Sequence, residues 1–360
     1  MQEAAAAETA SGNMQRIGGF YRSFMNTDAI EQAGIAPLKP EFDAIDGLAS
    51  SEDIVRHFGV LQTVGVDGPI GFFVGTDAKS SKEHLAAVYQ SGTSLPDRDY
   101  YFVDDERYIE ARQALRDYIT TLFELAGLPG GAQAASDIVE LETKLALFQW
   151  SRTKLRDANL RYNKYAVGDL PELTPSLPWQ VFFAAVGTAD LAEVNVTTPS
   201  YFQALEAIFT TTPVETWKQY MRFRVLDAAA PALPQGFVDA SFELYQNKLA
   251  GVPEQKPRWE RAVETASGGR GFGVLGDAIG EIYVQKHFGQ EAKRRMDELV
   301  ANLLKTYEVS IKELTWMTED TKQKALEKLH KITPKIGYTE KWRDYSNLQI
   351  DAEDLLGNMR

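Results

Sequence analysis

The alternation of apolar and polar positions has a helical period along most of the chain. Apolar residues recur three or four positions apart in the segment 109–123, and Gly127 followed by Pro129 predicts the end of that helix. The segment 138–148 keeps the same period, and Ser136 is positioned to cap it. These patterns predict two long amphipathic helices.

Two further helices are predicted in the last third of the chain. The segment 296–314 has the same apolar spacing. Thr318, followed by Glu319 and Asp320, predicts a helix start with negative charge near the positive end of the helix dipole. Another helical pattern begins at Asp351.

Only two short segments have the composition of strands, "IGFFVG" at 70–75 and "EVNVT" at 193–197. Prolines and glycines interrupt the helical runs, for example at 231–236 and 251–257, without forming a long linker. The sequence therefore predicts a mainly α fold of several helices with a few short β-strands.

Composition and charge restrict the possible partners. The 360 residues are enough for about two domains. A net charge of −13 and a pI near 4.9 disfavour a nucleic acid or an anionic membrane surface as partner. Because the chain has no cysteine, disulfides, thiolate catalysis and cysteine metal sites are excluded.

The two ends give little information about the compartment. No run of about 18 apolar residues occurs, so no membrane span is expected. The first residues, "MQEAAAAETASGN", lack the basic start and apolar core of a signal peptide and resemble the end of an alanine-rich helix. Since the pattern that begins at Asp351 runs to Arg360 without a stop signal, we expect both ends to be cut.

The glycines Gly271, Gly273 and Gly276 have the G-x-G-x-x-G spacing of a dinucleotide site. Such a site needs a buried strand directly before the glycines. The segment 258–267 instead has the pattern of an amphipathic helix, and no second strand with an acidic end follows. We therefore expect a loop that opens a closely packed helix and no dinucleotide binding.

Groups that perform chemistry are few. The four histidines, which occur in helix-like sequence, are His57, His84, His287 and His330. No two of them have the i, i+4 spacing of helical zinc ligands. Neither the zinc motif H-E-x-x-H nor the nucleophile motif G-x-S-x-G occurs. The acidic run 104–106 is expected to cap a helix or to face solvent. No catalytic, cofactor-binding or metal-binding residue is assigned in this chain.

The segment "SLPDRDYYFVDDERY" at 94–108 is the most informative one. It places Arg98 between Asp97 and Asp99, directly before Tyr100 and Tyr101. A guanidinium among aromatic rings requires carboxylate or carbonyl partners when it is desolvated. This pattern favours a structural clamp at Arg98 over a ligand site.

Several segments, in this order, resemble the N-terminal region of the neprilysin-type zinc metallopeptidases, which include endothelin-converting enzyme and bacterial oligopeptidase O. The most specific are "LPDRDYY" at 95–101 and "LTWMTEDTKQKALEKL" at 314–329. The others are "FYRSFMNTDAIEQAGIAPLKP" at 20–40, "FFVGTDAKSS" at 72–81, "YNK" at 162–164, "PRWERAV" at 257–263, "LGDAIGEIYVQKHF" at 275–288 and "KIGYTEKWRDYS" at 335–346.

The resemblance implies that this chain is the non-catalytic N-terminal portion of a zinc-dependent metalloendopeptidase acting on oligopeptides. It implies a helical lid domain formed by 1–193 and 241–360, with 194–240 crossing to the catalytic domain. The lid would restrict the access of peptides, while the H-E-x-x-H helix and the zinc would belong to a C-terminal portion that is the partner of this chain. By itself the chain is expected to bind no zinc and to be inactive, and the family favours a periplasmic or secreted location. The alternative is a related helical scaffold or binding protein that works without zinc.

Overall fold

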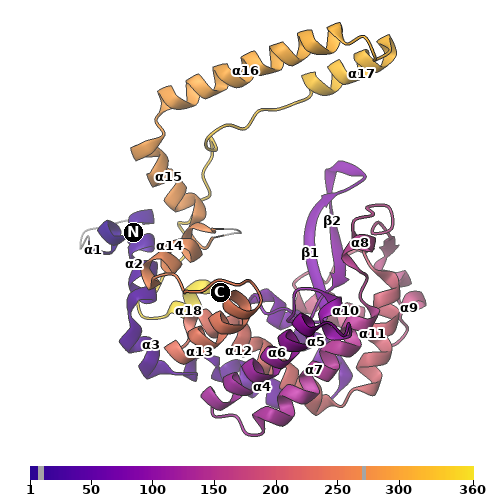
Figure 1. Cartoon of the computed structure of the whole chain (residues 1–360), viewed down its shortest axis with the longest axis vertical. Coiled ribbons are helices and arrows are strands. Elements are labelled where there is room, and N and C mark those ends of the chain that lie inside the picture. Colours follow the sequence, from indigo (N-terminus) through magenta and orange to yellow (C-terminus); the bar gives the residue numbers. More distant parts are fainter. Residues whose placement is uncertain (7–11, 270–272) are drawn as a thin grey trace. The chain divides into compact units, whose positions relative to one another are not determined.

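The computed structural model describes residues 1–6, 12–269 and 273–360, which are mainly helical with one small sheet (Figure 1). These residues form two compact units. The first contains Met1–Asn26 and Lys256–Met359, and the second contains Thr27–Gln255 together with Arg360. Each unit buries apolar side chains of its own, and each is described separately.

The second unit consists of helices around the sheet. Its α-helices are α3 (Thr27–Ala33), α4 (Lys39–Asp46), α5 (Ser51–Thr63), α6 (Glu106–Leu125), α7 (Gly131–Phe148), α8 (Arg152–Leu155), α9 (Leu170–Leu173), α10 (Trp179–Ala185), α11 (Pro199–Thr211), α12 (Val214–Ala229) and α13 (Gln235–Ser241). The short 3-10 helices are η1 (Ala36–Leu38), η2 (Arg98–Tyr101), η3 (Val167–Asp169) and η4 (Ala230–Ala232), and η5 (Phe242–Lys248) is a π-helix.

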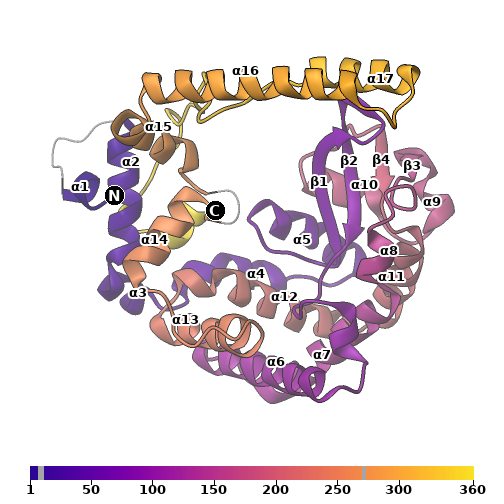
Figure 2. The ribbon, with the colours of Figure 1, turned by 45° about the horizontal axis from the view of Figure 1, so that its top comes forward.

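The sheet has the strand order β1-β2-β4-β3. Its strands are β1 (Ile70–Asp77), β2 (Ser80–Gln90), β3 (Lys164–Ala166) and β4 (Glu193–Val196). The strands β1 and β2 form an antiparallel hairpin, which lies beside α10 (Figure 2). The strand β2 continues the sheet in parallel with β4, and β3 pairs antiparallel with β4.

The two faces of the sheet have different surroundings. Phe72 packs against Phe182 and Phe183 of α10, with ring centroids 6.3 and 6.2 Å away. Because successive side chains of a strand point to opposite faces, Phe73 lies on the other face, where its ring centroid is 5.8 Å from that of Tyr89. One face is therefore covered by α10, whereas the other carries Phe73, which is 51% exposed.

The core of the second unit is rich in aromatic side chains. The helix α5 begins with a capping box, in which the Ser50 side chain accepts from the Asp53 backbone N–H and the Asp53 carboxylate accepts from Ser50. The inner face of this helix places Phe58 edge-on to Trp217 of α12 at 5.6 Å. Phe209 stacks on the same indole at 4.7 Å, so α5, α11 and α12 share one aromatic cluster.

The first unit is assembled from both ends of the chain. It contains α1 (Gln2–Ala6), α2 (Gly12–Met25), α14 (Arg258–Ser267), α15 (Gly276–His287), α16 (Gln290–Glu313), α17 (Glu319–His330) and α18 (Leu355–Met359). The Arg258 guanidinium of α14 lies 5.3 Å from the Phe24 ring of α2 and donates to the Phe24 carbonyl oxygen at 2.6 Å. At Gly18 of α2 a Cβ would lie 2.4 Å from the Ala4 carbonyl oxygen, so α1 approaches only because residue 18 is glycine.

Most of the predicted elements are confirmed, and the fold is mainly α with a few short strands, as predicted. The helices α6, α7, α14, α16 and α17 and the strands β1 and β4 lie where the pattern places them. Thr318 caps α17 by accepting from the Thr321 backbone N–H. Asp105, in the acidic run 104–106, caps α6 in the same way.

Other predictions are wrong. Ser136 does not cap α7, because the helix begins at Gly131 and its N-cap is Gly130, which has a left-handed φ of 74°. His84 lies in the strand β2, which the sequence pattern did not indicate, rather than in a helix. The helix near the C-terminus begins at Leu355 and not at Asp351.

The predicted division into 1–193, 194–240 and 241–360 refers to a whole enzyme and stays a prediction. Within this chain, residues 194–240 all belong to the second unit, where they form most of β4 and the helices α11, α12 and η4 with part of α13.

Candidate functional site

The "LPDRDYY" segment forms η2 and contacts the end of α7. Asp97 caps η2 by accepting from the Asp99 backbone N–H. The Arg98 guanidinium donates to the Gln149 carbonyl oxygen and lies 4.8 Å from the Phe102 ring. This contact agrees with the predicted clamp at Arg98. Its main partner is a backbone carbonyl, since the Asp99 carboxylate is half exposed and 3.7 Å away.

A buried carboxylate lies behind the same segment. Glu142 of α7 is fully buried and accepts from the Tyr101 hydroxyl at 2.5 Å and from the Ser94 backbone N–H at 3.0 Å and hydroxyl at 2.7 Å. Burial raises the pKa of Glu142, while the Arg224 guanidinium and these hydrogen bonds act in the opposite direction. Each oxygen of this carboxylate thus has a protein partner, which is the arrangement expected of a structural group.

Arg224 connects Glu142 to a second carboxylate. Its guanidinium donates to the Ser94 hydroxyl at 3.1 Å and lies 3.6 Å from Asp227. Asp227 also accepts from the hydroxyls of Tyr118 at 2.8 Å and Tyr245 at 3.1 Å. The whole group joins η2, α6, α7, α12 and η5. We refer to Ser94, Tyr101, Tyr118, Glu142, Arg224, Asp227 and Tyr245 as the buried polar network.

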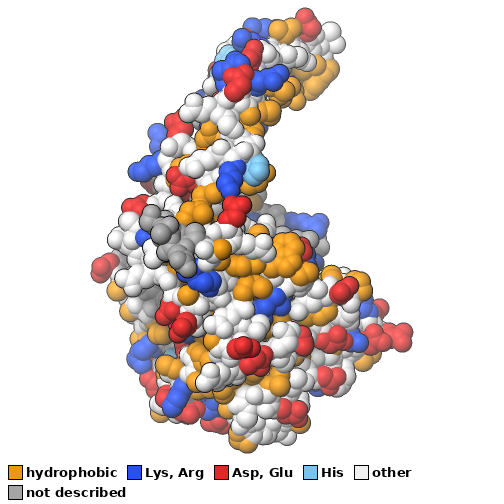
Figure 3. Space-filling view, turned by 90° about the vertical axis from the view of Figure 1, so that its left-hand side faces the viewer, with side chains coloured by type: hydrophobic (Ala, Val, Ile, Leu, Met, Phe, Trp, Pro, Cys, Tyr) orange, Lys and Arg blue, Asp and Glu red, His pale blue; other side chains and the backbone are white. Residues whose placement is uncertain are grey.

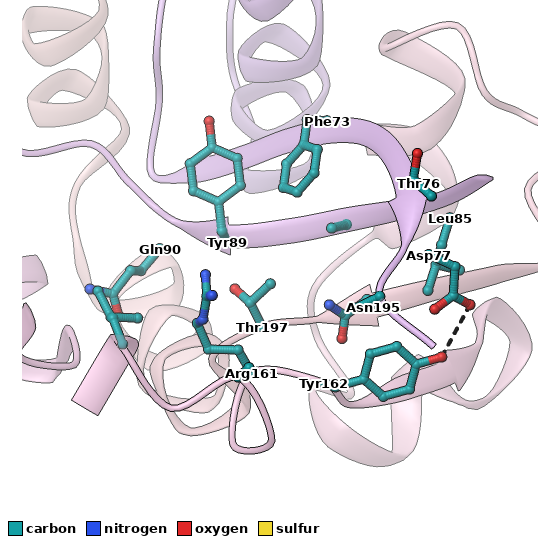
Figure 4. A pocket seen from close by; sticks show the side chains of 14 residues that line it. Phe73, Thr76, Asp77, Leu85, Tyr89, Gln90, Arg161, Tyr162, Asn195 and Thr197 are labelled. Atoms are coloured by element: carbon teal, nitrogen blue, oxygen red, sulfur yellow. Dashed lines mark hydrogen bonds between the residues drawn. The ribbon is translucent and has the colours of Figure 1, made fainter. Parts of the chain in front are cut away.

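An open pocket of about 420 Å³ lies on the uncovered face of the sheet (Figure 4). Its floor consists of side chains from β1, β2 and β4, and its rim comes from α8 and the segment that connects it to β3. The lining residues are Phe73, Thr76, Asp77, Ala78, Leu85, Ala87, Tyr89, Gln90, Leu155, Ala158, Arg161, Tyr162, Asn195 and Thr197. This volume is within the range of small-ligand sites.

One end of the pocket is fixed by Asp77. Its carboxylate accepts from the Lys79 backbone N–H at 2.8 Å and from the Tyr162 hydroxyl at 3.1 Å. These bonds, the one from Lys79 first, hold the pKa of Asp77 below its usual value. The Lys79 ammonium lies 4.3 Å from the Tyr162 ring. Asp77 is therefore an ionised group with its own partners, and it positions Tyr162 at the rim.

The sequence patterns did not predict this pocket. Its residues come from the segments 73–90, 155–162 and 195–197, which only the sheet brings together. The one available signal was charge, because the segment 152–164 carries five basic residues and one acidic residue in a chain of net charge −13.

The helix α16 has an apolar face that no described residue of the first unit buries. None of the 24 residues of α16 is buried, and α17 also has no buried residue. The exposed apolar face consists of Met296, Leu299, Leu303 and Tyr307, which are 38, 54, 49 and 54% exposed. Figure 3 shows hydrophobic side chains along one side of these helices, in the upper part of the view.

The glycine segment gives no support to a dinucleotide site. Residues 258–267 form α14, as predicted, and Gly276 begins α15. Gly271 lies outside the described residues. Gly273 packs closely, since a Cβ there would lie 2.2 Å from the Gly268 nitrogen.

Comparison with known proteins identifies the family. The family model described as Peptidase family M13 matches residues 1–339. The chain belongs to peptidase family M13. Endothelin-converting enzyme 1 of Rattus norvegicus is 27% identical over 349 residues, which cover 92% of this M13 chain and 44% of the rat enzyme. For the Homo sapiens enzyme the identity is also 27%, over 89% of this chain and 42% of that protein.

Solved structures of M13 proteins have the same fold. The zinc metalloprotease Zmp1 of Mycobacterium tuberculosis in its open state matches 99% of this M13 chain and 55% of its own, with 40% identity and a TM-score of 0.89. PepO from Lactobacillus rhamnosis HN001 is 21% identical with a TM-score of 0.83 and shares the fold. The chain thus spans about half the length of the solved relatives and less than half of the curated ones.

The residues that the structure describes do not fit a zinc site. Within the ranges 1–6, 12–269 and 273–360, no three His, Asp or Glu side chains gather so as to hold a metal ion. The four histidines of the M13 chain lie on α5, β2, α15 and α17. His57 is buried, its Nε2 has no hydrogen-bond partner among the residues that the structure describes, and burial lowers its pKa. His287 contacts the Tyr283 ring at 4.8 Å, and His330 lies 3.6 Å from Glu308.

Among the helices that the structure describes, none has the length and apolar character that crossing a membrane requires.

Proposed function

We propose that this chain is the N-terminal, non-catalytic portion of a zinc-dependent metalloendopeptidase of family M13. In this proposal the zinc ligands and the catalytic residues belong to a C-terminal portion. The helical portion allows only short peptides to enter the active site. The support is the family match over residues 1–339 together with the coverage of only 44% of the rat endothelin-converting enzyme. No catalytic step is assigned to any residue of this chain.

The observation that carries the proposal is the uncovered apolar face of α16. Four large apolar side chains recur there at intervals of three or four residues, which places them on one side of the helix. Val300, Leu304 and Ile311 are half-buried, and their spacing places them on a neighbouring strip of the helix surface. A helix normally gains most of its stability from packing of an apolar face. We assign the free face to contact with the C-terminal portion.

The length of the related proteins indicates which polypeptide covers the apolar face of α16. Relatives of this family contain about as much chain again as the part that matches this one. Burial of one large apolar side chain contributes about 1.5–3 kcal/mol, so a partner that covers these four residues is held by several kcal/mol. Oligopeptides are the proposed substrates of the assembled enzyme.

The proposal is tested by reconstitution. The 360-residue chain and the polypeptide encoded directly after residue 360 are purified separately, analysed for zinc after dialysis, and assayed alone and mixed with a quenched peptide. We expect stoichiometric zinc only in the second polypeptide and peptide cleavage only in the mixture. Zinc with peptidase activity in the 360-residue chain alone contradicts the proposal.

The role of α16 is tested by a matched pair of variants. Leu299→Glu with Leu303→Glu is expected to abolish activity in the mixture, because two charges would be buried at the interface. Ala301→Glu with Lys305→Glu has the same spacing on the opposite, exposed side of the helix and is expected to keep it. Equal activity of the two pairs would rule out the α16 face as the interface.

The second candidate is a helical scaffold or binding protein without zinc. It is favoured if a stop codon follows residue 360, or if the chain gives no activity with any downstream polypeptide.

A further inference from the structure

The pocket on the sheet contains one cation that no described residue neutralises. The Arg161 side chain is exposed and makes no hydrogen bond or ion pair with the residues that the structure describes. Figure 4 shows it reaching from the rim toward β2, the strand of Tyr89. The Asp77 carboxylate of the same pocket is held by Lys79 and Tyr162 and is not paired with Arg161. A guanidinium without an ion pair favours an anionic ligand, and carboxylates match its planar fork.

Three of the four other basic residues of the segment 152–164 have partners among the described residues. Arg152 pairs with Asp97 at 2.7 Å, and Lys164 pairs with Glu193 at 2.7 Å. Lys154 lies over the Trp150 ring at 3.6 Å. Arg161 is therefore the cation of this segment that lines the pocket and has its donors available. The segment 152–164 has an excess of positive charge in a chain that is acidic as a whole. Such a local excess attracts negatively charged ligands.

The floor of the pocket is apolar beside this cation. Phe73 is half exposed and contacts Tyr89, and Leu85 extends the same surface. A large apolar side chain that covers these rings gains from burial and from ring contact. Asn195 accepts from the Asn163 backbone N–H through its side-chain oxygen, which leaves its amide N–H groups for a ligand.

We propose that this pocket binds a peptide segment in which a carboxylate pairs with Arg161 and an adjacent large apolar side chain lies over Phe73 and Tyr89. The inference rests on the proposed function in taking peptides as the ligand class. It assigns to the non-catalytic portion a peptide subsite of its own, formed within the second unit. The carboxylate belongs either to an acidic side chain or to a free C-terminus.

The test measures binding to the 360-residue chain without zinc or cleavage, by ligand-detected NMR titration. Three peptides are compared: acetyl-Ala-Glu-Phe-Ala-amide, its Gln counterpart, and acetyl-Ala-Gln-Phe with a free C-terminal carboxylate. We expect one of the two peptides with a carboxylate to bind roughly fivefold tighter than the neutral one, as for a partly exposed ion pair. Which of the two binds tighter identifies the source of the carboxylate.

Variants locate the binding. Arg161→Gln is expected to remove the preference for a carboxylate and to leave the neutral peptide unchanged. Phe73→Ala is expected to weaken all three peptides. Arg156→Gln, an exposed arginine of the same segment that does not line the pocket, is the matched control and is expected to keep the preference. Circular dichroism melts establish that each variant is folded.

The inference is overturned if the neutral and acidic peptides bind equally, if the preference survives Arg161→Gln, or if acetate competes as well as the peptides do. Because the assay needs no catalytic portion, its failure is distinct from a failure of reconstitution. If the reconstituted mixture cleaves peptide but the 360-residue chain alone binds none of the three peptides, the proposed function stands and the proposed subsite is wrong.

Discussion

The Tyr101 hydroxyl donates a hydrogen bond of 2.5 Å to the fully buried Glu142 carboxylate. The same hydroxyl accepts from the backbone N–H groups of Ser94 and Leu95, each at 2.9 Å. One phenol oxygen thus satisfies two backbone donors and one carboxylate. It ties the turn before η2 to the middle of α7.

Tyr101→Phe is expected to lower the free energy of unfolding by about 2–3 kcal/mol, because it leaves a buried carboxylate and two backbone donors without this partner. Urea denaturation followed by circular dichroism measures the change. Tyr100→Phe is the matched control, since the Tyr100 hydroxyl makes no hydrogen bond with the described residues. Equal stability of the two variants would contradict a structural role for the hydroxyl.

Arg98→Ala is expected to lower the free energy of unfolding by about 1–3 kcal/mol, because the Gln149 carbonyl loses a charged donor and Phe102 loses its cation contact. Arg107→Ala removes an exposed arginine from the neighbouring helix and serves as control. If thermal melts of the two variants coincide with that of the wild type, Arg98 is not a clamp.

The buried His57 predicts a loss of stability in mild acid. Burial lowers the pKa of His57, and the Glu41 carboxylate opposes this effect. The unfolded chain takes up a proton near pH 6.5, whereas the folded chain takes it up only at lower pH. The contribution of His57 to the free energy of unfolding is therefore complete above pH 6.5 and decreases as the pH falls below it. Between pH 7.5 and 5.5, His57→Gln should lose less stability than the wild type, as measured by urea denaturation at each pH.

The glycine segment is expected to bind no dinucleotide, because the helix α14, and not a strand, precedes it. Calorimetric titration with NAD or FAD should give no heat of binding. Micromolar, stoichiometric binding that Gly273→Ala or Gly276→Ala abolishes would contradict this expectation.

The helices were predictable where one face of a long segment is apolar, as in α6 and α16. The strand β2 was not, because its first half carries Lys82, Glu83 and His84 at exposed positions and has no alternating pattern. Its neighbour β4 lies about a hundred residues further along the chain, so no local signal indicates the pairing. The start of α7 depends on the left-handed backbone of Gly130, whereas Ser136 matched a capping pattern in the wrong place.

The candidate sites also differ in how far the sequence could predict them. The apolar face of α16 follows from spacing within one helix, and the resemblance to the peptidases anticipated a docking partner. The pocket is formed by three segments that are distant in the sequence. Arg161 could not be singled out from the sequence, because only the folded sheet brings it close to Phe73 and Tyr89. Sequence reasoning detected the clamp residue Arg98 but not Glu142, which lies 44 positions later and contacts the same segment.

The discontinuous first unit imposes an order on biosynthesis. The helix α2, with Phe20 and Phe24, leaves the ribosome long before α14 at 258–267, against which it packs. At about 5–20 residues per second, roughly ten to fifty seconds pass before its partner is made. During that interval the second unit can fold, whereas the apolar side of α2 stays without its partner helix. Chaperones that hold such segments are therefore expected to engage the nascent chain there, and ribosome profiling of chaperone-bound chains truncated before and after residue 267 would reveal the release.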